Sequence, residues 1–110
     1  MKTNIRQQNG VHILDVIGRI DSSVAPKLEE ELNNLISQGV IKIIVNFKEV
    51  SYISSGGLRV LLAVIKQLKT KNGDLKLYGM KPNIYKIFKL VGFTSIFKIY
   101  ESEEEAVGEF

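Results

Sequence analysis

Two adjacent serines followed by two glycines stand directly before a strongly apolar stretch, within residues 51–62. Ser54 or Ser55 can cap a helix, because a serine hydroxyl accepts a hydrogen bond from a free N–H of the first turn. Gly56 and Gly57 would let the backbone turn sharply and keep the surroundings of the serines open. An exposed hydroxyl beside unpaired N–H groups and the positive end of a helix dipole also tolerates a phosphate. The segment therefore predicts either a plain helix start or a phosphorylation site.

The remaining chemistry-bearing residues form no catalytic or metal-binding pattern. There is no cysteine and only one histidine, His12, which excludes thiolate sites, cysteine nucleophiles and histidine clusters for zinc. The chain lacks both the G-x-x-x-x-G-K-[ST] phosphate loop and the G-x-S-x-G nucleophile elbow. Asp15 and Asp21 have no second carboxylate at a spacing that favours acid–base catalysis, and the consecutive glutamates 29–31 indicate a solvated helix face. We expect no enzyme activity, no catalytic residue, no metal and no cofactor.

Length and composition are those of an ordinary globular protein. The chain has 110 residues, of which 45% are hydrophobic and 25% charged, and this is the size of one domain. The longest apolar run, residues 60–65, is far shorter than the roughly 20 residues that span a bilayer. The polar N-terminus has no signal-peptide pattern. We expect one domain over residues 1–110, located in the cytoplasm and not in a membrane.

The net charge of +3 is unevenly distributed along the sequence. Residues 59–98 contain nine lysines and arginines and a single acid, Asp74, whereas five glutamates follow Tyr100. The basic stretch indicates solvated helix faces or a surface for an acidic partner or a phosphate. A nucleotide- or nucleic-acid-binding protein that uses residues 59–98 is therefore an alternative, and a steep salt dependence of binding would support it.

Turn signals and apolar spacing divide the chain into alternating strands and helices. Strands are expected over residues 2–8, 11–17, 40–45, 75–78 and 96–100. Helices are expected between residues 22 and 39, between 54 and 72, between 82 and 92, and from 102 onward. Helical crossovers between apolar strands imply an α/β fold with a mixed, mainly parallel β-sheet of four to five strands packed with about four helices.

Local signals define the first elements more closely. Asn9 and Gly10 favour a tight hairpin turn, which places the first strand at the sheet edge. Residues 18–21 are expected to form a turn, and Ser22 or Ser23 is expected to cap the first helix.

An apolar stripe at helical spacing follows the serines. The residues predicted to face the core are Leu58, Leu61, Leu62, Ile65 and Leu68. Those predicted to face solvent are Arg59, Lys66 and Lys69.

Residues 52–62, with the sequence YISSGGLRVLL, resemble the signature of the STAS domain family, the anti-sigma factor antagonists of bacteria. Residues 18–21 look like the glycine-x-aliphatic-aspartate turn of that family. Residues 81–97 and the acidic terminal helix are similar to its C-terminal half. The resemblance covers nearly the whole chain and implies a STAS-like fold and a function in protein–protein binding.

The resemblance also implies a phosphorylation switch. In the family, a partner anti-sigma factor that is also a serine kinase phosphorylates a serine three residues before a leucine, and counting back from Leu58 gives Ser55. Many phosphorylated members have aspartate directly before the acceptor, where this chain has Ser54, so Ser54 is an alternative acceptor. The unmodified protein would bind the anti-sigma factor and release a sigma factor. Phosphorylation would end that binding, and a serine phosphatase would restore it.

By the same resemblance, the partner-binding surface surrounds the serines. Its expected members are Asp21, Ser54, Ser55, Gly56, Gly57 and Arg59. Asp21 is expected near Ser55 because both loops follow strands of one sheet. No direct contact with DNA is expected. A STAS module in another signalling assembly, stressosome-like or associated with a transporter, is a further alternative.

Overall fold

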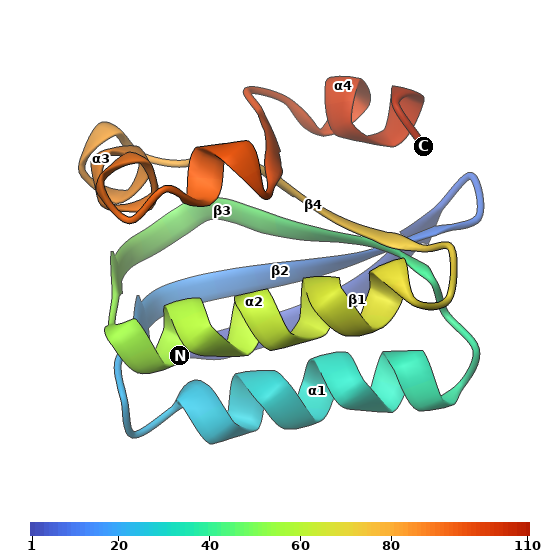
Figure 1. Cartoon of the computed structure of the whole chain (residues 1–110), viewed down its shortest axis with the longest axis horizontal. Coiled ribbons are helices and arrows are strands. Elements are labelled where there is room, and N and C mark those ends of the chain that lie inside the picture. The colour runs from blue at the N-terminus through green and yellow to red at the C-terminus, as the bar shows by residue number, and fades with distance from the viewer.

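The chain forms one five-stranded sheet with helices on both of its faces (Figure 1). A computed structural model describes all residues 1–110. The elements along the chain are β1 (Lys2–Gln8), β2 (Val11–Ile20), α1 (Ala25–Ser37), β3 (Lys42–Ile53), α2 (Ser55–Lys69), β4 (Asp74–Tyr78), α3 (Pro82–Leu90), the short 3-10 helix η1 (Phe93–Ser95), β5 (Lys98–Tyr100) and α4 (Glu103–Gly108). The predicted α/β fold with a mixed, mainly parallel sheet is confirmed.

The strands lie in the order of the sequence, from β1 at one edge to β5 at the other. β1 and β2 are antiparallel and joined by Asn9 and Gly10, both of which have positive φ, as the tight turn requires. The other neighbouring strands are parallel, so each pair is joined by a crossover that contains a helix. The predicted hairpin and its edge strand are confirmed.

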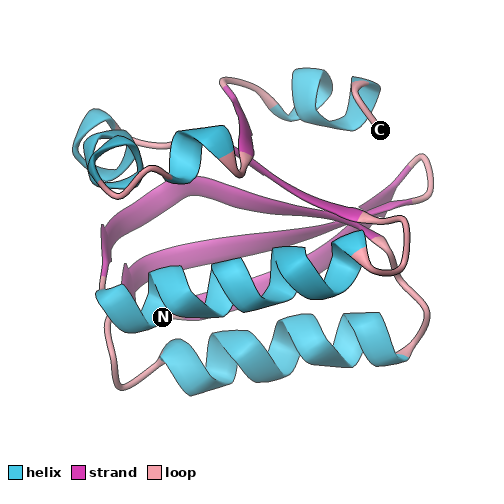
Figure 2. Ribbon diagram, viewed as in Figure 1, coloured by secondary structure: helices cyan, strands magenta, loops and turns pink.

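Helices α1 and α2 run side by side over one face of the sheet (Figures 1 and 2). Side chains alternate along β3, so that Ile43, Val45 and Phe47 point to this face while Ile44 and Asn46 point to the other. The fully buried leucines of the two helices close the core, and each contributes about 1.5–3 kcal/mol by leaving water. Those leucines are Leu28, Leu32, Leu61 and Leu68.

Helix α4 covers part of the opposite face, above a second and smaller core (Figure 1). This core consists of Val11, Ile13, Ile44, Tyr78 and Ala106. Lys76 lies in the same layer and is only 2% exposed, since its ammonium pairs with Asp74 and lies 4.6 Å from the centre of the Phe110 ring. Lys76 is therefore an exception to the solvated faces expected for the basic stretch.

Three predicted boundaries were wrong. Residues 18–20 continue β2 instead of forming a turn, because register shifts around Gly18 let the strand stay paired with β3. β3 extends well past residue 45, to Ile53. The last strand begins only at Lys98, since residues 93–95 form η1.

The apolar stripe of α2 also differs from the prediction at one position. Leu58, Leu61, Ile65 and Leu68 are buried, but Leu62 is half-buried and Val64 takes its place in the core. Residues 61, 64, 65 and 68 follow the helical period, whereas residue 62 lies one position further round, on the flank of the helix. The charged residues of this helix are exposed as predicted: Arg59, Lys66 and Lys69.

Candidate functional site

The loops that carry the predicted site residues leave the sheet side by side. Ile20 and Ile53 are the last paired residues of β2 and β3. The N–H of Ser54 donates a hydrogen bond of 2.8 Å to the carbonyl of Ile20, so the pairing continues one residue beyond β3. Asp21 follows Ile20 directly, and the expectation that the two loops adjoin is confirmed.

The two adjacent serines have different environments. Ser54 is the N-cap of α2: its backbone is extended, its side chain accepts a hydrogen bond of 3.2 Å from the N–H of Gly57, and it is 9% exposed. Ser55 is the first residue of α2 and is exposed, and its hydroxyl makes no hydrogen bond within the protein. The buried serine thus builds the helix start, while the exposed one is free to react or bind.

The two glycines of the segment do not bend the backbone, and the prediction of a sharp turn was wrong. Neither has a positive φ, and both lie in the first turn of α2. A Cβ at Gly57 would lie 2.7 Å from Cγ2 of Ile20 and 2.9 Å from Cγ1 of Ile53. A Cβ at Gly56 would meet only ordinary contacts of 3.6 Å or more. Gly57 therefore allows α2 to begin tightly against the ends of the two strands.

Asp21 organises the turn that leads into α1. Its Oδ1 accepts hydrogen bonds from the Ser23 hydroxyl at 2.6 Å and from the N–H groups of Ser23 and Val24. Asp21, and not Ser22 or Ser23 as predicted, thus satisfies the free N–H groups of this turn. The hydrogen bond from the Ser23 hydroxyl, helped by these N–H groups, lowers the pKa of Asp21, so the loop beside Ser54 carries a negative charge.

Two further residues at this end of the sheet were missed by the sequence analysis. Arg19 and Tyr52 are register partners on β2 and β3, and the guanidinium of Arg19 lies 4.3 Å from the centre of the Tyr52 ring. Tyr52 remains 37% exposed. An aromatic residue shortly before the serines was the only local signal, since the stacking depends on strand register. Exposed tyrosine and arginine side chains are frequent at the centres of protein interfaces.

Arg59 lies one turn after Ser55 on α2, is exposed, and forms no ion pair. It borders a shallow hollow of about 440 Å³ between the starts of α1 and α2, together with Gly56 and Glu29. The structure therefore brings all six predicted partner-binding residues to one end of the sheet.

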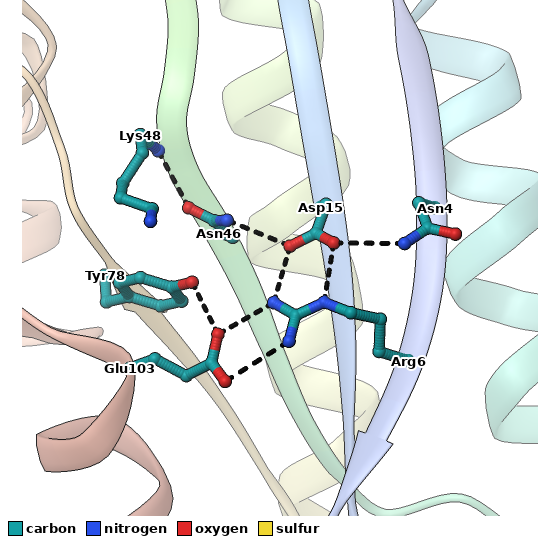
Figure 3. Close-up of polar contacts among 7 residues, drawn as sticks. All are labelled: Asn4, Arg6, Asp15, Asn46, Lys48, Tyr78 and Glu103. Atoms are coloured by element: carbon teal, nitrogen blue, oxygen red, sulfur yellow. Dashed lines mark hydrogen bonds and ion pairs between the residues drawn. The ribbon is translucent and has the colours of Figure 1, made fainter.

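A second polar cluster lies on the face of the sheet beside α4 (Figure 3). Arg6 of β1 donates to Asp15 of β2 at 2.7 and 2.8 Å and to Glu103 of α4 at 2.7 and 3.2 Å. The Tyr78 hydroxyl donates to Glu103 at 2.8 Å, and Asn46 donates to Asp15. We call Arg6, Asp15, Tyr78 and Glu103 the β1–α4 clamp.

Arg6 carries the single positive charge of the clamp and pairs with both of its carboxylates. Hydrogen bonds from Arg6 lower the pKa of Asp15 to about 2 and also lower the pKa of Glu103. Burial, together with the bond to Glu103, raises the pKa of the Tyr78 hydroxyl. No member of the clamp is therefore poised to exchange a proton near neutral pH, and the cluster joins the first strand to the last helix instead of forming a reactive centre.

Other sequence expectations concern isolated polar residues. Glu31, expected on a solvated face, is half-buried and accepts a hydrogen bond from Thr3. One carboxylate oxygen of Glu31 and Nδ1 of His12 are buried without a hydrogen-bond partner.

No group of three histidine, aspartate or glutamate side chains is placed so that it could hold a metal ion. None of the helices combines the length and apolar character needed to cross a bilayer.

Comparisons with known proteins agree on one family. Residues 2–106 match the family described as the STAS domain. The chain is 36% identical to BtrV of Bordetella bronchiseptica, a candidate anti-sigma factor antagonist, over all of this chain and 95% of that one. It is 31% identical to the anti-sigma-B factor antagonist of Listeria monocytogenes, over 94% of this chain and 92% of that one.

Solved structures resemble the fold closely. A candidate anti-sigma factor antagonist of Thermotoga maritima superposes with a TM-score of 0.93 at 21% identity, over 97% of this chain and 92% of that chain. The Bacillus cell fate determinant SpoIIAA in its phosphorylated form superposes with a TM-score of 0.77 at 22% identity, over 98% of both chains.

Proposed function

The chain belongs to the STAS domain family, and on that premise we propose that it is an anti-sigma factor antagonist switched by phosphorylation of Ser55. It acts as one domain over residues 1–110 and works by binding a protein partner, not by catalysis. The names of its relatives in Bordetella and Listeria support the role of antagonist. The partner is an anti-sigma factor of the serine-kinase type, and its sequestration releases a sigma factor.

The contrast between Ser54 and Ser55 is the observation that carries this proposal. The hydroxyl of Ser54 is buried and already accepts the N–H of Gly57, so a kinase would have to dismantle the start of α2 to reach it. Ser55 is exposed, and its hydroxyl has no partner in the protein. This difference favours Ser55 over Ser54 as the acceptor.

In the phosphate-transfer step the kinase supplies ATP and the catalytic base, and Ser55 is the substrate. Oγ of Ser55 attacks the γ-phosphorus of ATP held by the kinase, the bond to the β–γ bridging oxygen breaks, and ADP leaves. The hydroxyl proton passes to a base of the kinase. A serine phosphatase later hydrolyses the phosphate ester and regenerates Ser55. That the fold neighbour SpoIIAA exists in a phosphorylated form is consistent with such a cycle.

Charge explains why the phosphate would end binding. A phosphoserine adds about −1.5 to −2 charge near neutral pH, and it would do so beside Asp21, whose lowered pKa keeps it ionised. The residue next to Ser55, Gly56, is half-buried and has no side chain. A partner surface that fits a small hydroxyl would have to desolvate the phosphate without supplying a cation of its own, which is costly.

The test combines phosphate mapping with affinity measurements. The protein is incubated with the cognate serine-kinase anti-sigma factor and ATP, and mass spectrometry locates the phosphate. Ser55→Asp should weaken binding to that partner at least about tenfold, or 1.4 kcal/mol. Ser55→Ala should bind like the parent and accept no phosphate.

Ser54→Asn is the matched control, because asparagine keeps a cap for α2 but removes the neighbouring hydroxyl. This variant should still be phosphorylated at Ser55. Phosphate on Ser54 would move the switch by one residue. Absence of phosphate from both serines, together with full binding by Ser55→Asp, would refute the switch.

A further inference from the structure

Building on the proposed switch, we infer that Arg59 is the intramolecular partner of a phosphate on Ser55. The two residues are four apart on α2 and both are exposed, so their side chains lie on the same side of the helix one turn apart. Helical side chains tilt toward the N-terminus of their helix, so a side chain at position 59 can reach back toward residue 55.

Arg59 has no competing ionic partner in the unmodified protein. Glu29 of α1 borders the same shallow hollow as Arg59 but forms no ion pair with Arg59. The other arginine near this end of the sheet, Arg19, is stacked on Tyr52 and contributes to the lowered pKa of Asp21. Arg59 is thus the free guanidinium of this region. Two acids lie at this end of the sheet: Asp21 directly follows β2, and Glu29 borders the hollow beside Arg59.

The same molecule contains a comparable arrangement at α4. Glu103 is the first residue of that helix, as Ser55 is of α2, and its carboxylate is paired with the guanidinium of Arg6 at 2.7 Å. A phosphate on Ser55 would present three acceptor oxygens to the fork of Arg59, which suits the paired N–H donors of a guanidinium.

The pairing gives phosphorylation two effects on the partner surface. The phosphate covers Ser55, and the guanidinium of Arg59 turns toward it and is withdrawn from any contact with the partner. The modified first turn of α2 would be held in place by its own side chains. Phosphorylation would then change a local charge pattern while the domain keeps its fold.

The test uses protein with phosphoserine incorporated at position 55 by genetic code expansion, so that no kinase is needed. The phosphate is titrated by 31P NMR in the parent, in Arg59→Gln, in Arg59→Lys and in Lys66→Gln. Arg59→Gln should raise the pKa of the phosphate, with a proton affinity about twofold higher, or roughly 0.4 kcal/mol, the size of a helical ion pair.

Two further variants distinguish a specific pairing of Arg59 with the phosphate from a general effect of positive charge on α2. Arg59→Lys should keep part of the effect, because the charge remains while the fork is lost. Lys66→Gln removes an exposed cation from the same helix, 11 residues after Ser55 and about 16 Å along the axis, and should titrate like the parent. Identical titrations of the parent and Arg59→Gln, or equal effects of Arg59→Gln and Lys66→Gln, would overturn the inference. Kinase assays on Ser55 decide the proposed function separately.

Discussion

The starts of α2 and α4 are built from the same cap, but the first turn of α2 is uncharged and that of α4 is acidic. Ser54 and Ser102 each accept a hydrogen bond of 3.2 Å from the N–H three residues later. The first turn of α4 contains three glutamates, and one of them, Glu103, is held by Arg6 and Tyr78. The first turn of α2 has no acidic residue and consists of Ser55 followed by two glycines.

This difference gives the two helix starts different properties: the start of α4 is fixed to the sheet, whereas the start of α2 can still accept an anion. At α4 the free N–H groups and the helix dipole are already matched by carboxylates, and the clamp ties them to the sheet. At α2 the same favourable electrostatics are left without an anion, and the first side chain is exposed. A helix start that is capped but not charged can accept a negative group without being rebuilt, and the four predictions below test this contrast.

The largest expected effect is at Gly57, the third residue of α2. Gly57→Ala should destabilise the protein by about 1–3 kcal/mol, because the new Cβ overlaps Ile20 and Ile53. Gly56→Ala is the control and should be neutral or stabilising by up to about 1 kcal/mol, since alanine favours the helix and meets no clash. Urea unfolding of both variants measures this. Equal stability of the two alanine variants would contradict the close packing at Gly57.

Removing the arginine of the clamp should have the next largest effect. Arg6→Met leaves Asp15 and Glu103 without their cation and should cost about 1–2 kcal/mol at pH 7. The pKa of Asp15 is about 2 in the folded protein and about 3.9 when unfolded. A depressed carboxyl pKa stabilises the fold above the unfolded pKa, and this contribution is lost as the pH falls from about 4 toward 2.

Arg6→Met should therefore lose less stability than the parent over that acidic range. Lys2→Met is the matched control, because it removes an exposed cation of β1 that forms no ion pair. Urea unfolding at pH 7, 4 and 3 compares the three proteins. If Lys2→Met flattens the acid dependence as much as Arg6→Met, the clamp is not its cause.

Removing the capping hydroxyls of α2 and α4 should lower the stability of the protein by different amounts. Ser54→Ala leaves the N–H of Gly57 buried without an acceptor and should cost about 1–2 kcal/mol. Ser102→Ala leaves the N–H of Glu105 to be hydrated by water and should cost about 0.5 kcal/mol. Thermal unfolding of the pair gives the ranking, and a larger loss at Ser102 would reverse the comparison.

The smallest effect is expected from placing an anion at the empty helix start. Ser55→Asp should stabilise the protein by about 0.3–1 kcal/mol at low salt, because the carboxylate meets the positive end of α2. The gain should shrink at high salt through screening, and Ser55→Asn, which adds no charge, should show none. Thermal melting at two salt concentrations distinguishes these cases, and destabilisation by Ser55→Asp would show that this site does not accept an anion.

Local signals in the sequence were sufficient for the order of the strands and helices and for placing the serines at the start of α2. Asn9 and Gly10 predicted the hairpin, and the apolar spacing after Ser55 predicted α2, because these features depend on neighbours within a few residues. The side-by-side position of Asp21 and Ser54 followed from the parallel sheet alone.

The features that were not predicted depend on contacts between distant segments. The clamp joins residues 97 positions apart, Arg6 and Glu103, and nothing in either local sequence indicates the other. The packing role of Gly57 depends on where the strand ends lie. The burial of Lys76 depends on Asp74 and on Phe110, which lies 34 residues later in the chain. Such features need the register and crossovers of the finished fold.

The clamp also sets an order for events during synthesis. Arg6 is translated well before its partner Glu103, which lies 97 positions later in the chain. Until then β1 can pair with β2 through their short hairpin, while Arg6 can meet only Asp15. Closing so long a loop has a high entropic cost. The docking of α4 is therefore a late step, and a ribosome-bound chain that ends before residue 103 would carry the second face of its sheet uncovered.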